Sequence, residues 1–90
     1  MKRSSKPMGR DGVILRQLDD EWVIYDPLSQ ELHVLNQTAA LVWLCCTGDK
    51  TSTDIVAALQ RVFGDQVSAD QLASDVAAAL EKFHELRLFL

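Results

Sequence analysis

The stretch ELHVLNQTAALVWLCC, from Glu31 to Cys46, decides the fold because it joins a strand pattern directly to a helix pattern. Residues 32–35 alternate as a short β-strand does. Asn36 is a favoured N-cap residue, and the run that follows it, centred on residues 39–46, is almost wholly apolar. Since a helix that is apolar all round is typical of a buried position, we predict a strand fixed against the central helix of a small domain.

Two further strand patterns lie upstream, at residues 13–18 and 22–25. Turn-forming residues separate the patterns: Asp19-Asp20 links the first to the second, and residues 26–30 link the second to the third. Consecutive strands with such short links predict an antiparallel meander in the order 1-2-3. The first and third strands then lie at the two edges of the sheet.

Two amphipathic helix patterns lie downstream, and each begins with a sequence similar to a capping box, at Thr51 and at Ser68. Gly64 and Asp65 end the first of these helices. The apolar stripe of the second helix consists of Leu72, Val76, Ala79, Leu80 and Phe83. The element order predicts an α+β, winged-helix-like fold, in which a three-stranded antiparallel sheet is followed by three helices.

The two ends of the chain differ in composition. Residues 1–11 carry Lys, Ser, Pro and Gly without periodicity and predict a flexible tail, followed by a single domain over residues 12–90. The apolar residues 86–90 predict a C-terminal segment that docks as a helical turn or a short strand. There is no apolar run of membrane-spanning length and no secretory signal pattern, so we expect a cytoplasmic protein without membrane contact.

The charge balance argues against nucleic acid as a partner. The formal net charge is −4, and affinity for nucleic acid comes mostly from basic contacts. Within residues 68–85, the third helix pattern carries four acidic residues and one lysine. A winged-helix protein that binds DNA would need a basic helix at this position, so this function is disfavoured.

Few residues could support catalysis, a metal ion or another cofactor. Cys45 and Cys46 are adjacent, and neighbours on a helix point about 100° apart, so we interpret them as core residues in a reducing compartment. His33 and His84 have no second ligand at a suitable spacing. His33 is opposite in phase to Leu32 and Val34, which predicts a side chain facing solvent or the sheet edge. We expect no catalytic residue, no metal site and no cofactor.

The third strand, residues 32–35, is an edge strand that lacks the lysine, proline or bulge with which native edges are usually protected. A loop, the tail or a second copy of the chain could cover it, the last as a homodimer formed by strand exchange. Alternatively, another chain could add to it as a strand, with main-chain hydrogen bonds supplying affinity. The third helix pattern is amphipathic enough to form one wall of a groove beside that edge.

The sequence LNQTAALVW at residues 35–43, followed by TSTDIVAAL at residues 51–59, resembles the PqqD-like family of small peptide chaperones. The upstream WVIYD at residues 22–26 and the downstream Asp75-Val76 fit the same family, so the resemblance covers roughly residues 12–90. This chain departs from the family pattern in two places. Residues 86–88 lack the glycine of the usual Arg-Gly-Leu turn, which puts a wing after the third helix in doubt, and Gln37 replaces a smaller residue.

The resemblance implies a winged-helix-like domain that binds the leader segment of a ribosomally synthesised precursor peptide. Such a domain presents the peptide to a modifying enzyme, often a radical S-adenosylmethionine enzyme, without catalysis of its own. In the family the leader adds as a strand against the third strand and packs between that strand and the third helix. Carried over to this chain, the peptide-binding positions are Glu31, Leu32, His33, Val34 and Leu35 on the strand and Leu72, Asp75, Val76, Ala79 and Phe83 on the helix.

A second hypothesis uses the same edge and groove. In it, the chain is a regulatory or scaffolding subunit that binds a folded partner enzyme rather than a leader peptide. The presence of a precursor-peptide gene beside this gene would favour the first hypothesis, and its absence would favour the second.

Overall fold

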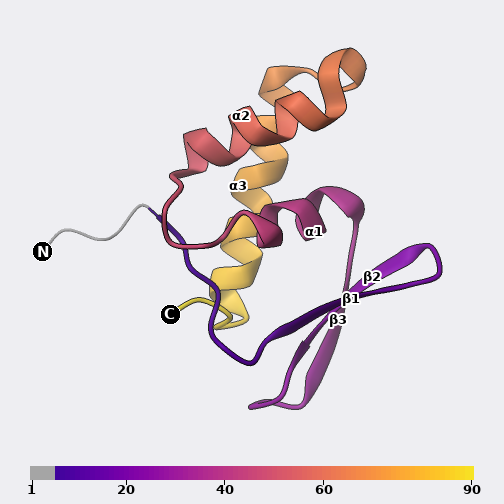
Figure 1. Cartoon of the computed structure of the whole chain (residues 1–90), viewed down its shortest axis with the longest axis vertical. Helices are drawn as coiled ribbons and strands as arrows, with labels where there is room; N and C mark the ends of the chain where they lie inside the picture. Colours follow the sequence, from indigo (N-terminus) through magenta and orange to yellow (C-terminus); the bar gives the residue numbers. More distant parts are fainter. Residues whose placement is uncertain (1–5) are drawn as a thin grey trace, which may run out of the picture.

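The computed structural model describes residues 6–90, which form a three-stranded antiparallel sheet followed by three helices (Figure 1). This confirms the predicted α+β fold and the strand order β1-β2-β3. None of the described helices is long and apolar enough to cross a membrane. The elements are β1 (Ile14–Leu18), β2 (Glu21–Asp26), β3 (Glu31–Leu35), α1 (Gln37–Leu44), α2 (Ser52–Phe63), a 3-10 turn (Gly64–Gln66) and α3 (Ala69–Glu85).

All three helices begin directly after the N-cap residues that the sequence predicts: Asn36, Thr51 and Ser68. Each of these side chains accepts a hydrogen bond from a backbone amide of the first helical turn. Thr51 and Asp54 form a complete capping box. At Ser68 the Gln71 side chain donates to Asp75 instead of returning to the N-cap amide.

The core lies between the sheet and the helices, and α3 makes its main helix contacts with α2 and α1. Ile24 of β2 is fully buried, as are Leu72, Val76 and Phe83 of α3. Phe83 also makes edge-to-face contacts with Trp43 and with Phe89 of the C-terminal segment. The α3 stripe that the sequence predicts is therefore the part of this helix that holds the domain together.

Helix α1 is less buried than its composition predicts. It ends at Leu44, whose side chain is 55% exposed, and only two of its residues, Ala40 and Val42, are fully buried. Cys46 follows the helix as a core residue, and its Sγ donates to the carbonyl oxygen of Val42 at 3.1 Å. Burial raises the pKa of the Cys46 thiol to about 12, so this side chain remains an uncharged thiol at neutral pH.

The described part of the N-terminal segment is paired rather than loose. Gly9 forms a β-bridge with Phe89, and the amide of Arg10 donates to the carbonyl oxygen of Leu88 at 2.8 Å. The C-terminal segment thus docks in strand-like fashion, as predicted. The predicted flexible tail, residues 1–11, lies partly outside the described residues. Its residues 8–10 differ from this expectation because their backbone groups form hydrogen bonds with Cys46 and with the C-terminal residues 88–90.

Gly9 is required by a close approach in this pairing. A Cβ atom at Gly9 would lie 2.5 Å from the Cη2 atom of Trp43, which is too close for any other residue without a shift. On the C-terminal side, the Trp43 ring is nearly parallel to that of Phe89, with centroids 6.2 Å apart. The indole therefore fixes both terminal segments against the core.

Helix α3 ends in a Schellman motif without glycine. The amide of Leu88 donates to Phe83 O and the amide of Arg87 donates to His84 O, each at 3.0 Å. Arg87 adopts a φ of +60°, a conformation that glycine adopts at less cost. The chain therefore closes α3 with arginine, rather than glycine, in the left-handed position.

The register of the sheet corrects the predicted orientation of His33. Ile24, which faces the helices, lies directly opposite His33, so His33 is half-buried on the helix-facing side. Leu32 and Val34 face the other way and are 57% and 58% exposed. His33 was predicted to face solvent or the sheet edge, and the solvent-facing orientation is wrong. The reason is that β3 carries apolar residues in both phases, and the neighbouring strand decides which phase is buried.

Candidate functional site

Strand β3 is an open edge in the described residues, since β2 pairs with one of its sides and no strand pairs with the other. The two-residue loop after β1 closes on the pair Leu18–Glu21, and such a closing pair is mutually hydrogen-bonded. Backbone groups alternate sides along an antiparallel strand. Counting from this pair, the N–H and C=O groups of Leu32 and Val34 point away from β2, toward the free edge.

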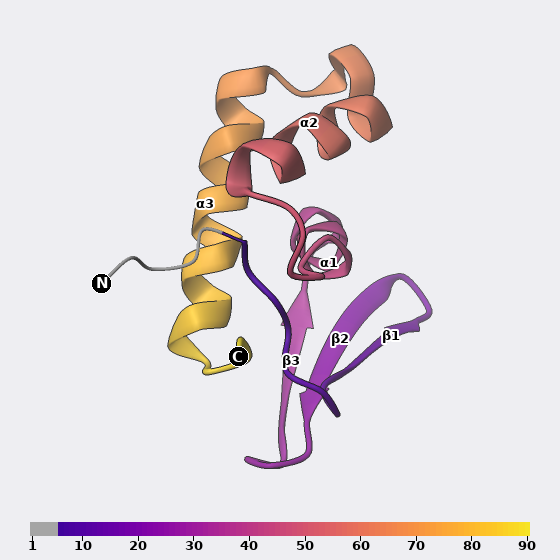
Figure 2. The same ribbon diagram turned by 60° about the vertical axis from the view of Figure 1, so that its left-hand side comes forward.

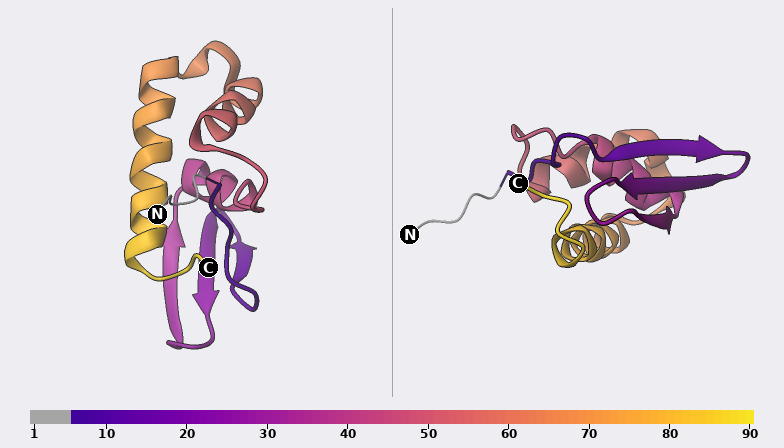
Figure 3. Two further views of the ribbon diagram at one scale, coloured as in Figure 1. Left: turned by 90° about the vertical axis from the view of Figure 1, so that its left-hand side faces the viewer. Right: turned by 90° about the horizontal axis from the view of Figure 1, so that it is seen from below.

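Helix α3 runs alongside this edge, and β3 is the strand nearest to it in both side views (Figures 2 and 3). Two hollows adjoin α3, one near each end of β3. The upper hollow, about 240 Å³, is lined by Asn36, Thr38, Ala39, Asp75, Ala78, Ala79 and Lys82. The lower hollow, about 440 Å³, is lined by Arg10, Asp26, Leu28, Ser29, Glu31, Glu85, Leu86 and Arg87.

Of the helix residues expected at the site, some line a hollow and the others are buried in the core. Asp75 and Ala79 line the upper hollow. Leu72, Val76 and Phe83 are fully buried in the core and reach no surface. Sequence reasoning missed two further residues of this wall, Ala78 and Lys82, although the positions 75, 78, 79 and 82 show the same helical spacing as the core stripe.

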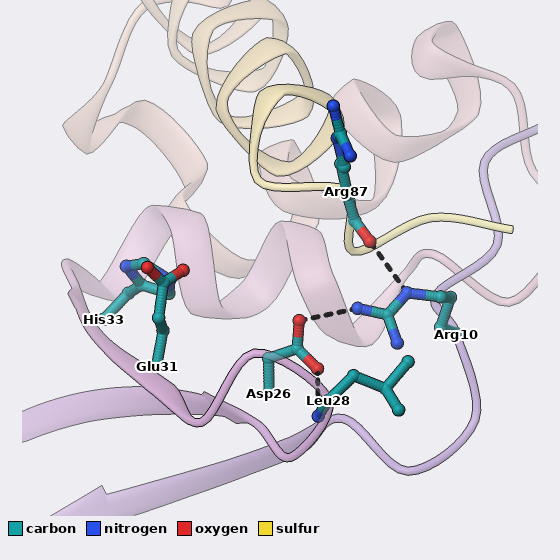
Figure 4. A network of polar contacts seen from close by, with 6 residues as sticks. All are labelled: Arg10, Asp26, Leu28, Glu31, His33 and Arg87. Atoms are coloured by element: carbon teal, nitrogen blue, oxygen red, sulfur yellow. Dashed lines mark hydrogen bonds and ion pairs between the residues drawn. The ribbon is translucent and has the colours of Figure 1, made fainter.

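The strand residues expected at the site lie on two faces of the sheet, because side chains alternate along a strand. Glu31, His33 and Leu35 share the helix-facing side of β3, where Leu35 is buried. His33 Nε2 lies 3.6 Å from Glu31 Oε1, and Figure 4 shows the two side chains next to each other. Leu32 and Val34 lie on the opposite, outer face of the sheet. A strand at this edge would therefore meet polar groups on one face and apolar groups on the other.

A polar network beside the lower hollow connects the β2–β3 turn to the turn that follows α3 (Figure 4). Arg10 Nη2 lies 2.7 Å from Asp26 Oδ2 of β2, and Arg10 Nε donates to the carbonyl oxygen of Arg87, beyond α3, at 2.7 Å. The amide of Leu28 donates to the other Asp26 oxygen at 3.0 Å. Nothing in the sequence indicated these contacts, because Arg10 lies in the predicted tail and its partners are remote along the chain.

The charge on Asp26 depends on these contacts. Burial disfavours the charged form, but the hydrogen bonds from the Leu28 amide and the Arg10 guanidinium outweigh it. The pKa of the Asp26 carboxyl therefore lies below its ordinary value. Arg10 thus ties the end of β2, and with it the β2–β3 turn, to the end of α3, and helps to set the spacing between β3 and α3.

The side chains and backbone groups around this edge are suited to binding a polypeptide. Within residues 6–90, no group of three or more His, Cys, Asp or Glu side chains is placed to hold a metal ion. The groups that the site offers are free backbone donors and acceptors, small alanine side chains and a few charges at the rim. Such groups recognise an extended polypeptide, in which main-chain bonds give affinity and alternate side chains give specificity.

Comparisons with known proteins agree with this geometry. The family model "Coenzyme PQQ synthesis protein D (PqqD)" matches residues 21–88. No curated protein matches the chain. A solved structure of TbiB1 in complex with the TbiA(beta) leader peptide is 20% identical, with a TM-score of 0.72 over 91% of this chain and 93% of that chain.

A second solved structure, lasso peptide synthetase B1 complexed with the leader peptide, is 25% identical. Its TM-score is 0.75, over 94% of this chain and 98% of that chain. The likeness therefore extends over the whole domain and is not confined to one motif. Since the family model spans β2, β3 and all three helices, the chain belongs to the PqqD family.

Proposed function

We propose that this protein binds the leader segment of a ribosomally synthesised precursor peptide as a fourth strand of its sheet and presents it to a separate modifying enzyme. The observation that carries the proposal is the free edge of β3 beside α3, with a hollow near each end of β3. The similar lasso peptide synthetase B1, which was solved with its leader peptide, supports the same function.

The proposed site consists of β3 and one face of α3. Glu31, Leu32, His33, Val34 and Leu35 form the strand side, on which Leu32 and Val34 offer main-chain bonds to the guest. Asp75 and Ala79, with Ala78 and Lys82, form the helix side. The buried residues of α3 fix the position of this wall, and we do not propose them as contacts.

The protein acts, in this proposal, as a non-catalytic chaperone without a cofactor. The modifying enzyme, such as a radical S-adenosylmethionine enzyme, then supplies all of the chemistry. A homodimer formed through the β3 edge would use the same backbone groups as the leader, so leader binding and strand exchange would compete.

A titration followed by NMR tests the proposal. The probe is a synthetic peptide with the leader sequence of a precursor encoded beside this protein's gene, added to ¹⁵N-labelled protein. We expect the amide signals of β3 and of residues 75–82 to shift, and the amides of Leu32 and Val34 to exchange more slowly with solvent. A scrambled peptide of the same composition is the control. Shifts confined to β1, or none at all, would exclude this site.

A further inference from the structure

The outer face of the sheet, which points away from the helices, is unusually apolar for a solvent-facing surface. Apart from Arg16, its positions on the two edge strands are apolar: Ile14 and Leu18 on β1 and Leu32 and Val34 on β3. Their exposed fractions are 43%, 50%, 57% and 58%, respectively. A sheet with one face on the core normally carries polar residues on the other face, so these four residues require an explanation.

A comparison of two valines shows what would cover the β3 side of this face. Val23 and Val34 lie directly opposite each other on the outer face, yet Val23 is 6% exposed and Val34 is 58% exposed. Val23 has a paired residue on both sides, Arg16 on β1 and Val34 on β3. Among residues 6–90, Val34 has a paired residue on the β2 side only. A fourth strand at the β3 edge would give Val34 the second neighbour that Val23 already has.

The alternation of a strand then determines which residues of the guest provide this cover. A residue directly opposite Val34 or Leu32 places its side chain on the same outer face, with Cβ atoms roughly 4.5–5.5 Å apart. The residues between them point to the helix-facing side, toward His33 and the two hollows. Leu32 and Val34 also carry the free backbone groups. In an antiparallel guest strand, the main-chain bonds and the outer contacts therefore fall on the same pair of guest residues.

We propose that the leader is recognised on both faces of the sheet, and that its outward side chains, two residues apart, are apolar and pack on Leu32 and Val34. This inference rests on the proposed function and defines the substrate class more closely. The preferred leader has apolar or β-branched residues in both phases of the bound strand, rather than in the phase that faces the groove alone.

The β1 edge provides a matched control for this proposal. Ile14 and Leu18 are exposed on the same face to a similar degree, but α3 lies on the β3 side of the sheet, and β1 makes its main contacts with β2 (Figure 2). Threonine keeps the β-branched shape that strands favour while it removes apolar surface. The double variants Leu32→Thr/Val34→Thr and Ile14→Thr/Leu18→Thr therefore make the same kind of change at opposite edges.

Isothermal titration of the wild type and both double variants with the same synthetic leader peptide tests the proposal. We expect Leu32→Thr/Val34→Thr to weaken binding about 5- to 30-fold, the effect of losing two cross-strand apolar pairs, and Ile14→Thr/Leu18→Thr to leave it within about twofold. If the wild type binds and the β3 variant binds equally well, the two-faced proposal is overturned while the proposed function stands. If the wild type binds no leader, the proposed function itself fails.

A second measurement uses the wild-type protein alone, so that it does not depend on the folding of any variant. Each residue of the leader is replaced in turn by serine, and the affinity of each peptide is measured. If serine lowers the affinity at consecutive leader residues, whose side chains point to opposite faces of the sheet, the leader is recognised on both faces. Losses at every second residue alone would show that only the groove side is recognised, and would overturn the proposal.

Discussion

The two edge strands of the sheet, β1 and β3, are equal in length and similar in exposed apolar surface, yet only β3 forms part of the candidate peptide-binding site. Both β1 and β3 have five residues, and each has one side that no described strand pairs with. Beside β3 lies α3, with a hollow near each end of β3, whereas β1 makes its main contacts with β2. An exposed edge becomes a specific receptor only when a second wall restricts what can lie along it.

The largest difference between the two edges is expected when proline removes an outward backbone N–H from each of them. In Val34→Pro, the ring removes one free N–H of β3 and obstructs an added strand, so we expect leader affinity to fall by roughly tenfold or more. The matched variant is Gln17→Pro, which removes an outward N–H of β1 by the same alternation. Calorimetric titration should show no loss for Gln17→Pro, and equal losses at both edges would end the distinction between them.

Filling the upper hollow should weaken binding by a smaller factor. In Ala78→Leu, the larger side chain occupies space beside Asp75 and Ala79 that the leader would use, and we expect a loss of about fivefold by fluorescence anisotropy. The control is Ala77→Leu, an exposed neighbour that does not line the hollow. If both variants bind as the wild type does, the helix-side wall is misplaced.

The ion pair between Arg10 and Asp26 should make the free energy of unfolding depend on pH. The pKa of Asp26 is lowered in the folded state, so its contribution is fully present above the unfolded value of about 3.8 and is lost as the pH falls through the folded pKa. We expect the wild type to exceed Asp26→Asn in free energy of unfolding at pH 7, and this excess to shrink toward pH 3. Urea titrations across this range measure it, and a constant difference would contradict a charged Asp26.

The smallest effect is expected at the turn after α3. Arg87 has a φ of +60°, and glycine adopts that conformation without the steric cost of a Cβ atom. Arg87→Gly should raise the free energy of unfolding by roughly 0.5–1 kcal/mol in urea titrations. The contact from Arg10 goes to the backbone oxygen of Arg87 and survives the change. A loss of stability would show that the arginine side chain itself contributes.

The sequence predicts well what local chemistry determines. Asn36, Thr51 and Ser68 have the side chains that a helix N-terminus needs, and each begins a helix where it was expected. The apolar spacing of α3 correctly identifies its core stripe. These features are visible because residues close in sequence satisfy one another.

The orientation of β3 and the role of Arg10 could not be predicted in the same way. Leu32, Val34 and Leu35 make either face of β3 plausible as the buried one, and the pairing of His33 with Ile24 decides between them. Arg10 meets Asp26 and the turn at Arg87 only after the whole domain has closed. Such information resides in contacts between remote segments rather than in local periodicity.

The bridge between Gly9 and Phe89 has a consequence for the order of folding. It joins segments about as far apart in sequence as this chain permits, and closing such a long loop is entropically costly, so we expect it to form late and open first. Hydrogen exchange at Gly9, Arg10 and Leu90 should then be faster than in the core of α3. Each such opening would free the backbone that carries Arg10, so we expect its ion pair with Asp26, and with it the lining of the lower hollow, to loosen before the domain unfolds.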